Sequence, residues 1–227
     1  MTNIQRIGGV AALIEAATFT VGIIMAVTVL SPFAFGELRA GQIVPFLAAN
    51  QLTLQVWNAV IYLVFGVFLV ILAMALYERL KPGSTAMVKT ATIFGFIWAT
   101  LVIASGMIFS VGLETVVDLA GTDPGQAASA WVAIGAVQDG LGGGVEIVGA
   151  IWILLLSWAA LRDGGLPKAL NYLGVAISMA GILTVIPSLG DLGALFGLGS
   201  IVWFTWLGVV MLRENPSSVP RSSETYP

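Results

Sequence analysis

Six apolar segments constrain this chain more than any other feature of its sequence. They cover roughly residues 7–30, 52–77, 86–113, 128–161, 168–186 and 192–212. A bilayer hydrocarbon core about 30 Å thick takes about 20 apolar residues to cross as a helix, and a helix satisfies its own backbone hydrogen bonds in lipid. We therefore predict an all-α polytopic membrane protein in which residues 1–214 form a bundle of six transmembrane helices.

The composition agrees with lipid as the main solvent. Of the 227 residues, 58% are hydrophobic and only 9% are charged, whereas a soluble domain carries about 25% charged residues. The apolar run over residues 7–30 is longer than the roughly 7–15 residues of a secretory signal's apolar core, so we interpret it as the first span. Residues 215–227 are rich in serine and proline, and we predict that they form a polar, disordered cytoplasmic tail.

The chain contains no cysteine and no histidine. Their absence excludes disulfides, iron–sulfur clusters, thiolate zinc sites and histidine-ligated haem, and it removes the usual general base at neutral pH. Lys81, Lys89 and Lys168 lie in or beside predicted loops, which argues against a retinal Schiff base. We expect no metal, no cofactor and no catalytic residue, and the net charge of −3 gives no indication of nucleic-acid binding.

The placement of lysine and arginine predicts the orientation of the bundle, because these residues are enriched in cytoplasmic loops. Eight of the nine lie in the two tails, between the second and third segments, or between the fourth and fifth: Arg6, Arg79, Lys81, Lys89, Arg162, Lys168, Arg213 and Arg221. Only Arg39 lies in a loop on the other side. We therefore predict that both termini are cytoplasmic, which agrees with an even number of spans.

The first outer connection, residues 31–51, is not a simple polar loop. It contains several large apolar side chains: Phe33, Phe35, Ile43, Val44, Phe46 and Leu47. Such a segment favours an interfacial or partly re-entrant helix, or a cap packed over the outer face of the bundle. We expect the segment to be broken near Pro45, because proline removes a backbone donor and clashes with the preceding turn.

Polar side chains at membrane depth form our candidate site for a ligand or an ion: Asp139, Glu146, Glu15, Asn58, Gln55 and Gln138. Ionisable groups at this depth usually face a bundle interior or a wet cavity. On a straight helix, Asp139 lies about 10 Å further out than Glu146 and on nearly the same face. We therefore predict that Glu15, Asp139 and Glu146 line one polar pocket, with Asn58 or Gln55 at its outer end.

These acids have no lysine or arginine at membrane depth to pair with. We expect them either to be protonated, because desolvation disfavours the charged form, or to bind a cation. The competing interpretation is that they are neutral groups whose hydrogen bonds only hold helices together.

Glycines are the second unusual feature of the fourth segment. Four of them fall within five residues: Gly140, Gly142, Gly143 and Gly144. Such a run predicts either a close helix crossing or a broken helix whose freed backbone lines a cavity. In the third and sixth segments, Gly95 and Gly197 are predicted to pack against neighbouring helices.

Short motifs along the chain point to a family. They are RIGG at residues 6–9, GAIW at 149–152, LPKAL at 166–170, GIL at 181–183, FGLGSIVWF at 196–204 and WLG at 206–208, accompanied by Asp139 and Gly174. With these motifs the chain resembles an uncharacterised family of bacterial six-helix integral membrane proteins, one of the domain-of-unknown-function groups. The resemblance implies six spans and a location in the bacterial inner membrane, and it carries no activity.

Three classes of function are compatible with these residues. The first is a proton- or cation-linked transporter, channel or small-solute-binding protein that uses intramembrane carboxylates. The second is a non-catalytic accessory subunit of a membrane complex, or a homo-oligomer, with small-residue stripes as contact faces. The third, an intramembrane enzyme, is the least favoured because the chain lacks an evident nucleophile. A water-filled cavity at the acids would favour the first class, and a dry interior with an exposed glycine stripe would favour the second.

Overall fold

The computed structural model describes residues 3–83, 85–143 and 146–213, and within these ranges every regular element is a helix. The α-helices are α1 (Asn3–Val27), α2 (Ser31–Ala34), α3 (Ala40–Ala49), α4 (Gln51–Asn58), α5 (Phe65–Leu80), α6 (Thr85–Ala120), α7 (Pro124–Gln138), α8 (Ile147–Asp163), α9 (Lys168–Leu183) and α10 (Leu192–Arg213). Two π-helices, η1 (Ala59–Val64) and η2 (Asp139–Gly143), and one 3-10 helix, η3 (Pro187–Leu189), complete this part of the chain. The predicted all-α class is therefore confirmed for the described residues.

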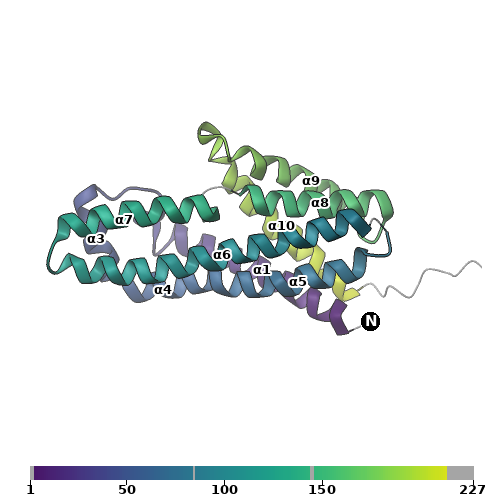
Figure 1. The fold of residues 1–227 in the computed structure, drawn as a ribbon, viewed down its shortest axis with the longest axis horizontal. Helices are drawn as coiled ribbons and strands as arrows, with labels where there is room; N and C mark the ends of the chain where they lie inside the picture. Colours follow the sequence, from purple (N-terminus) through teal and green to yellow (C-terminus); the bar gives the residue numbers. More distant parts are fainter. Residues whose placement is uncertain (1–2, 84, 144–145, 214–227) are drawn as a thin grey trace, which may run out of the picture.

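Six helices form a closed ring. Helix α1 packs against α10 and α5, α6 packs against α5 and α8, and α9 packs against α8 and α10. Figure 1 shows these helices side by side in the right-hand part of the molecule. We call α1, α5, the first half of α6, α8, α9 and α10 the six-helix ring.

Aromatic side chains fill the interior of the ring. Trp152, Trp203, Phe196 and Phe204 are fully buried. The ring centroids of Trp152 and Trp203 lie 5.9 Å apart, nearly perpendicular to each other, an arrangement that aromatic pairs favour. Such large side chains fit because glycines on facing helices leave room for them: a Cβ at Gly181 would lie 2.7 Å from the ring of Phe196, and one at Gly174 would lie 2.8 Å from Nε1 of Trp203.

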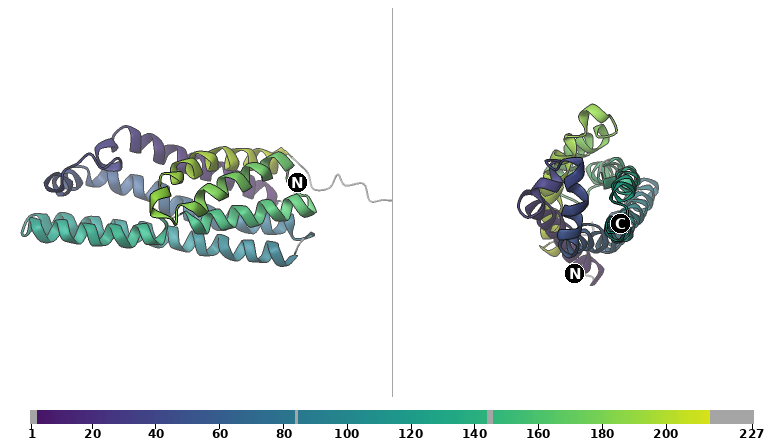
Figure 2. Two further views of the ribbon diagram at one scale, coloured as in Figure 1. Left: turned by 90° about the horizontal axis from the view of Figure 1, so that it is seen from above. Right: turned by 90° about the vertical axis from the view of Figure 1, so that its left-hand side faces the viewer.

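A second section extends beyond the ring and consists of α3, α4, α7 and the second half of α6. Helix α6 has 36 residues, about 54 Å at 1.5 Å per residue, so it is much longer than its ring neighbours. Figure 2 shows α6 and α7 extending together alongside α3 and α4. This distal section has its own apolar core: Leu30, Val44, Leu47, Leu54, Phe109, Leu113, Val116 and Ala127.

Helix α7 begins with a strong sequence signal. The side chain of Asp123 accepts a hydrogen bond of 2.9 Å from the backbone N–H of Gln126, and Pro124 occupies the first helical position. An aspartate cap followed by proline is a favoured helix start, because the first N–H groups have no partner within the helix. After this turn α7 packs back along α6, and the two helices form the α6–α7 hairpin.

Four helices in the described part are long and apolar enough to cross a membrane: Asn3–Val27, Gln51–Leu80, Ala86–Ala120 and Leu192–Arg213. They correspond to the first, second, third and sixth predicted segments. The fourth segment differs from the prediction, since α7, η2 and α8 divide it and residues 144–145 lie outside the described residues. The fifth, α9, has only 16 residues, fewer than the about 20 of a straight crossing.

The surface of the ring is apolar, as a lipid-facing surface would be. Large aliphatic side chains point outward from several helices, and Ile24, Val67 and Val202 are each more than half exposed. Together with the four long apolar helices, this surface supports a location in a membrane.

The described lysines and arginines, apart from Arg39, gather at one end of the ring. Arg79 at the end of α5 joins three segments there, because its side chain donates to the carbonyl of Gly165 at 2.7 Å and to the side chain of Gln5 at 3.4 Å. The turn between α5 and α6 also lies against the turn between α8 and α9, where Gly83 meets the side chain of Asp163. We call this end the basic end and the opposite end the distal end.

Residues 31–51 contain two helices rather than one broken near Pro45. Helix α2 ends at Ala34, and Pro45 lies inside α3. Proline leaves the carbonyl four residues earlier, that of Gly41, without its helical donor. Gly41 is exposed at the start of α3, so this carbonyl is accessible to solvent and the helix continues. One face of α3 buries Val44 and Leu47 in the distal core, consistent with a packed cap.

Candidate functional site

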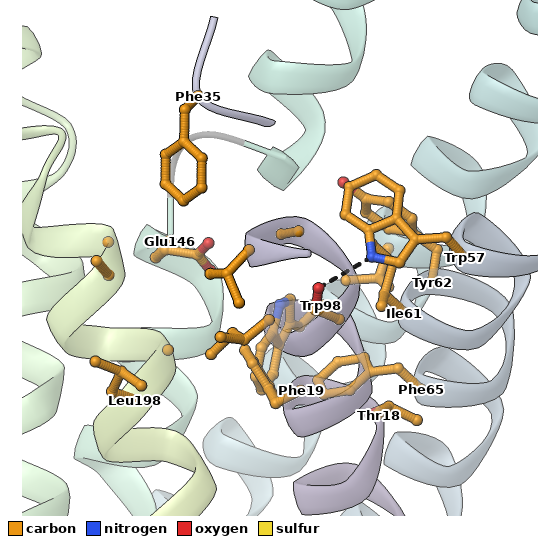
Figure 3. Close-up of a pocket in the computed structure, with 18 residues that line it drawn as sticks. Thr18, Phe19, Phe35, Trp57, Ile61, Tyr62, Phe65, Trp98, Glu146 and Leu198 are labelled. Carbon is orange, nitrogen blue, oxygen red and sulfur yellow. Dashed lines mark hydrogen bonds between the residues drawn. The ribbon is translucent and has the colours of Figure 1, made fainter. Parts of the chain in front are cut away.

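A cavity of about 510 Å³ lies inside the ring, in the half nearer the distal end. Figure 3 shows its labelled side chains, which converge from α1, from α4 and η1, from α10 and from the start of α8. The described residues that line it are Thr18, Phe19, Gly22, Ile23, Ala26, Val27, Phe35, Trp57, Ile61, Tyr62, Phe65, Trp98, Val102, Glu146, Gly193, Ala194, Gly197 and Leu198. The walls are therefore largely apolar and aromatic.

Aromatic contacts close the cavity toward the basic end. Phe19 meets Phe65 edge to face at 5.4 Å, and Phe65 meets Trp98 at 5.1 Å between ring centroids. Trp98 in turn contacts Trp152 at 5.6 Å, which connects this floor to the buried aromatic core. At the other end of the cavity, Phe35 is 62% exposed, so the mouth faces the distal end.

The π-helix η1 forms the wall that carries Ile61 and Tyr62. It lies close to α1, because Ile61 occupies the space that a Cβ at Gly22 would need. The indole N–H of Trp57 donates to the carbonyl of Gly22 at 3.1 Å, which fixes this ring at the cavity wall (Figure 3). Single π turns inside helices occur frequently at functional sites.

Glu146 places a carboxyl group in this apolar cavity. Figure 3 shows its side chain directed into the space between Phe35 and Phe19. The residue occupies the N-cap position of α8, and its backbone N–H donates to Oγ1 of Thr184 at 3.0 Å. Thr184 itself donates to the carbonyl of Gly181 at 2.7 Å. These bonds anchor the start of α8 to the end of α9, while no described residue donates a hydrogen bond to the Glu146 carboxylate.

Tyr62 brings several polar groups together at the edge of the cavity. Its hydroxyl lies beside the side chains of Gln138 and Ser105 and is within electrostatic range of the Glu146 and Asp139 carboxylates. Ser105 also donates to the backbone carbonyl of Gln138 at 3.4 Å. Of the six predicted site residues, Gln138 lies beside Tyr62, and Glu146 is the one that lines the cavity.

Asn58 and Gln55 fasten helices and do not line the cavity. The side-chain amide of Asn58 is buried and donates to the carbonyl of Gly106 and to Oγ of Ser110, both at 2.9 Å. Gln55 donates to the carbonyl of Ser110 at 3.0 Å. Both amides therefore tie α4 to the middle of α6.

The other two acids are placed differently from the prediction. Glu15 points inward and is fully buried, but it does not line the cavity, and neither carboxylate oxygen has a hydrogen-bond partner among the described residues. Asp139 is exposed. The single pocket predicted for three acids is thus not formed, because Asp139 and Glu146 would share a face only on a continuous α-helix. Asp139 belongs to the π-helix η2 and Glu146 directly precedes α8, so the two residues do not share one α-helix.

The predicted packing glycines also have different surroundings. A Cβ at Gly95 would lie 2.6 Å from Nε1 of Trp152 and 3.0 Å from Ala73, so this glycine allows a close helix approach. Gly197 instead borders the cavity, with Phe19 at an ordinary 3.8 Å. A Cβ at Gly140 would meet no atom of another helix within 4 Å among the described residues. Gly142 and Gly143 belong to η2, and Gly144 lies outside the described residues.

Sequence reasoning did not identify the aromatic lining. Phe19, Phe65 and Trp98 lie within apolar segments where nothing in the pattern separates an inward from a lipid-facing ring. Trp57 resembles an interfacial anchor in the sequence, although it lines the cavity. Glu146 did carry a signal in the sequence, because it is a polar residue at membrane depth that follows a run of glycines. Such a position is compatible with the start of a helix.

Comparison with known proteins places the chain in a family without assigning an activity. Comparison with curated proteins and with solved structures finds no match. A family described as a domain of unknown function (DUF4386) matches residues 9–212, which covers most of the chain and confirms the resemblance to an uncharacterised family. The chain belongs to the DUF4386 family.

Proposed function

We propose that this chain is a multi-pass protein of the bacterial inner membrane that binds a small solute in the cavity, as a transporter or a solute-binding membrane protein. The observation that carries the proposal is a cavity of about 510 Å³ inside the ring, with the Glu146 carboxyl directed into it. Ligand sites are commonly about 300–1,000 Å³ and are lined by apolar and aromatic side chains with few polar groups. The cavity fits that description.

The proposal includes six membrane spans with both termini in the cytoplasm, and residues 215–227 as a cytoplasmic tail. In this arrangement α7, η2 and α8 together make the fourth crossing, and α9 makes the fifth. The closed ring supports this count, because α8 and α9 pack between α6 and α10 as full members of it. Short helices such as α9 are accommodated in membranes by local thinning or by polar residues at their ends.

The polar residues take different roles in this proposal. Glu146 contacts the solute directly, and Tyr62, with Gln138 and Ser105 beside it, forms the polar edge of the site. Asn58 and Gln55 hold the wall that carries Trp57 and Tyr62 against α6. Because the aromatic floor separates the cavity from the basic end, a solute would enter from the distal end, and transport would require this floor to move.

The alternative function, an accessory subunit of a membrane complex, receives less support. Its contact faces were expected to be exposed stripes of small residues. At several glycines of the ring, a Cβ would instead come within 3 Å of a side chain of the same chain: Gly8, Gly9, Gly95, Gly149, Gly174, Gly181, Gly199 and Gly208. These close approaches are already used within the fold, which favours the solute-binding function.

The test is chemical access to the cavity. Because the natural chain has no cysteine, Ala26→Cys introduces a unique thiol on the cavity wall, and Ala17→Cys places one on an exposed, lipid-facing position of the same helix. In phosphatidylcholine nanodiscs we expect methyl methanethiosulfonate to modify the Ala26→Cys protein at least roughly tenfold faster, since only a hydrated thiol ionises readily. Intact-mass spectrometry measures both rates. An unreactive thiol at position 26, or equal rates at the two positions, would contradict a solvent-accessible cavity.

A further inference from the structure

We propose that the cavity selects organic monocations with a large apolar surface, such as quaternary ammonium or phosphonium ions. This inference rests on the proposed function, because it names the class of solute that the same cavity accepts. Two features of the lining carry it: the sign of its charge and the number of aromatic rings around that charge.

The charge of the lining is negative. Glu146 supplies a carboxylate, and the described lining residues include no lysine or arginine. Asp139, which is exposed and outside the lining, carries the same sign of charge. A carboxylate in an apolar site is costly unless a counter-charge accompanies it. The N-terminus of α8, where Glu146 lies, offsets part of that cost, because helix N-termini favour negative charge. A bound cation supplies the remaining compensation, whereas a neutral solute would leave the carboxylate unpaired.

Aromatic rings surround this charge. The lining contains Phe19, Phe35, Trp57, Tyr62, Phe65 and Trp98. Cations within about 6 Å of an aromatic face are attracted by the ring quadrupole, and quaternary ammonium ligands are recognised in this way. The hydrogen bond from Trp57 to Gly22 holds one of these rings in place. Rings also provide apolar contact for the substituents of an organic cation, which no inorganic cation can use.

The small number of side-chain oxygens and donors in the described lining disfavours the other charged solutes. Calcium and magnesium ions take about six or more oxygen ligands, but the lining offers the Glu146 carboxylate and the hydroxyls of Tyr62 and Thr18. The Thr18 hydroxyl already donates to the carbonyl of Glu15 at 2.8 Å, and the indole N–H of Trp57 is occupied. An anion would find few hydrogen-bond donors, the Tyr62 hydroxyl and the Trp98 indole N–H among them, and it would face the Glu146 carboxyl with no described lysine or arginine beside it. The lining thus matches a cation whose own surface is apolar.

A matched pair of ions tests this selectivity. Tetraphenylphosphonium and tetraphenylborate have nearly the same shape and opposite charge. In the Ala26→Cys protein in phosphatidylcholine nanodiscs, we expect tetraphenylphosphonium, at about ten times its Kd, to slow thiol modification roughly tenfold, and tetraphenylborate at the same concentration to leave the rate nearly unchanged. Adding Glu146→Gln should remove most of this protection. Adding Glu114→Gln, the same change at an exposed carboxylate of α6 outside the lining, should leave it intact.

The outcomes separate this inference from the proposed function. If the thiol at position 26 reacts but both ions protect it equally, or neither does, or Glu146→Gln keeps the preference, the cation selectivity is wrong and the accessible cavity stands. If the thiol does not react at all, the proposed function is wrong. Glu146→Asp, which retains the charge, should keep a preference for tetraphenylphosphonium over tetraphenylborate. This variant therefore decides the result if Glu146→Gln fails to fold.

Discussion

At the scale of single residues, Glu15 is the group whose burial calls for explanation. It lies on the face of α1 that packs into the apolar core, it is fully buried, and neither carboxylate oxygen finds a partner among the described residues. A buried polar group without a hydrogen bond costs about 1–3 kcal/mol. Its neighbours one turn away, Thr18 and Phe19, line the cavity, so the carboxyl lies just beneath the proposed site without belonging to its wall.

We predict that Glu15→Met, which replaces the carboxyl with an apolar side chain of similar length, raises the free energy of unfolding by about 1–3 kcal/mol, because it removes the unpartnered group. Denaturation in mixed micelles, followed by tryptophan fluorescence, measures the change. Glu114→Met, at an exposed site on α6, is the control and should change stability much less. A loss of stability in the Glu15 variant would mean that the carboxyl makes a favourable interaction in the folded protein.

At the scale of helices, two glycines that look alike in sequence are predicted to respond differently. Gly95→Leu should lower the free energy of unfolding by about 1–3 kcal/mol, because overpacking displaces neighbours and Trp152 and Ala73 already lie within 3.0 Å of the Cβ position. Gly197→Leu should retain stability but block thiol modification in the Ala26→Cys protein, because its side chain would enter the cavity. Melting curves and labelling rates measure both effects. Equal destabilisation by the two substitutions would show that Gly197 lies at a tight helix crossing.

The sequence allowed the helical class and the approximate limits of most apolar segments to be predicted, since lipid requires long helices with internally satisfied backbones. It did not predict the division of the fourth segment or the π turns. Whether a helix adopts a π turn at residues 59–64 or 139–143 depends on contacts with other helices, such as that between Ile61 and Gly22. Because Asp139 and Glu146 do not belong to one α-helix, their spacing of seven residues does not place them on one face: Asp139 is exposed, and Glu146 lines the cavity.

The cavity wall was not predictable for a different reason. In a soluble protein, apolar residues mark the buried face of a helix. In lipid, both the interior and the exterior are apolar, so Phe19 and Trp98 in the cavity look like Ile24 and Val202 on the surface. Polar residues retain a signal because lipid exposure costs several kcal/mol, which is why Glu146 could be selected from the sequence and its aromatic neighbours could not.

At the scale of the whole molecule, the fold links two turns that alternative topologies would separate. The carbonyl of Gly165, between α8 and α9, accepts a hydrogen bond from Arg79, at the end of α5. Leu80 also lies against Gly165, and Asp163 lies against Gly83. If only the four long helices crossed the membrane, the chain from α7 to η3 would stay on the outer side, and this contact between the two turns could not form.

The last prediction follows from that contact. Reporters inserted after Gly83 and after Gly164 should report the same, cytoplasmic side, and a reporter inserted after Asp191 should report the outer side. Green fluorescent protein, which fluoresces in the cytoplasm, and alkaline phosphatase, which is active outside it, provide opposite readouts at each position. The basic residues around both turns favour retention in the cytoplasm. Replacing Arg162 and Lys168 with glutamine should therefore weaken the fluorescence of the reporter after Gly164 more than the fluorescence of the reporter after Gly83. Phosphatase activity after Gly164, with fluorescence after Gly83, would instead mean that α8 and α9 do not cross, and the six-span arrangement would be wrong.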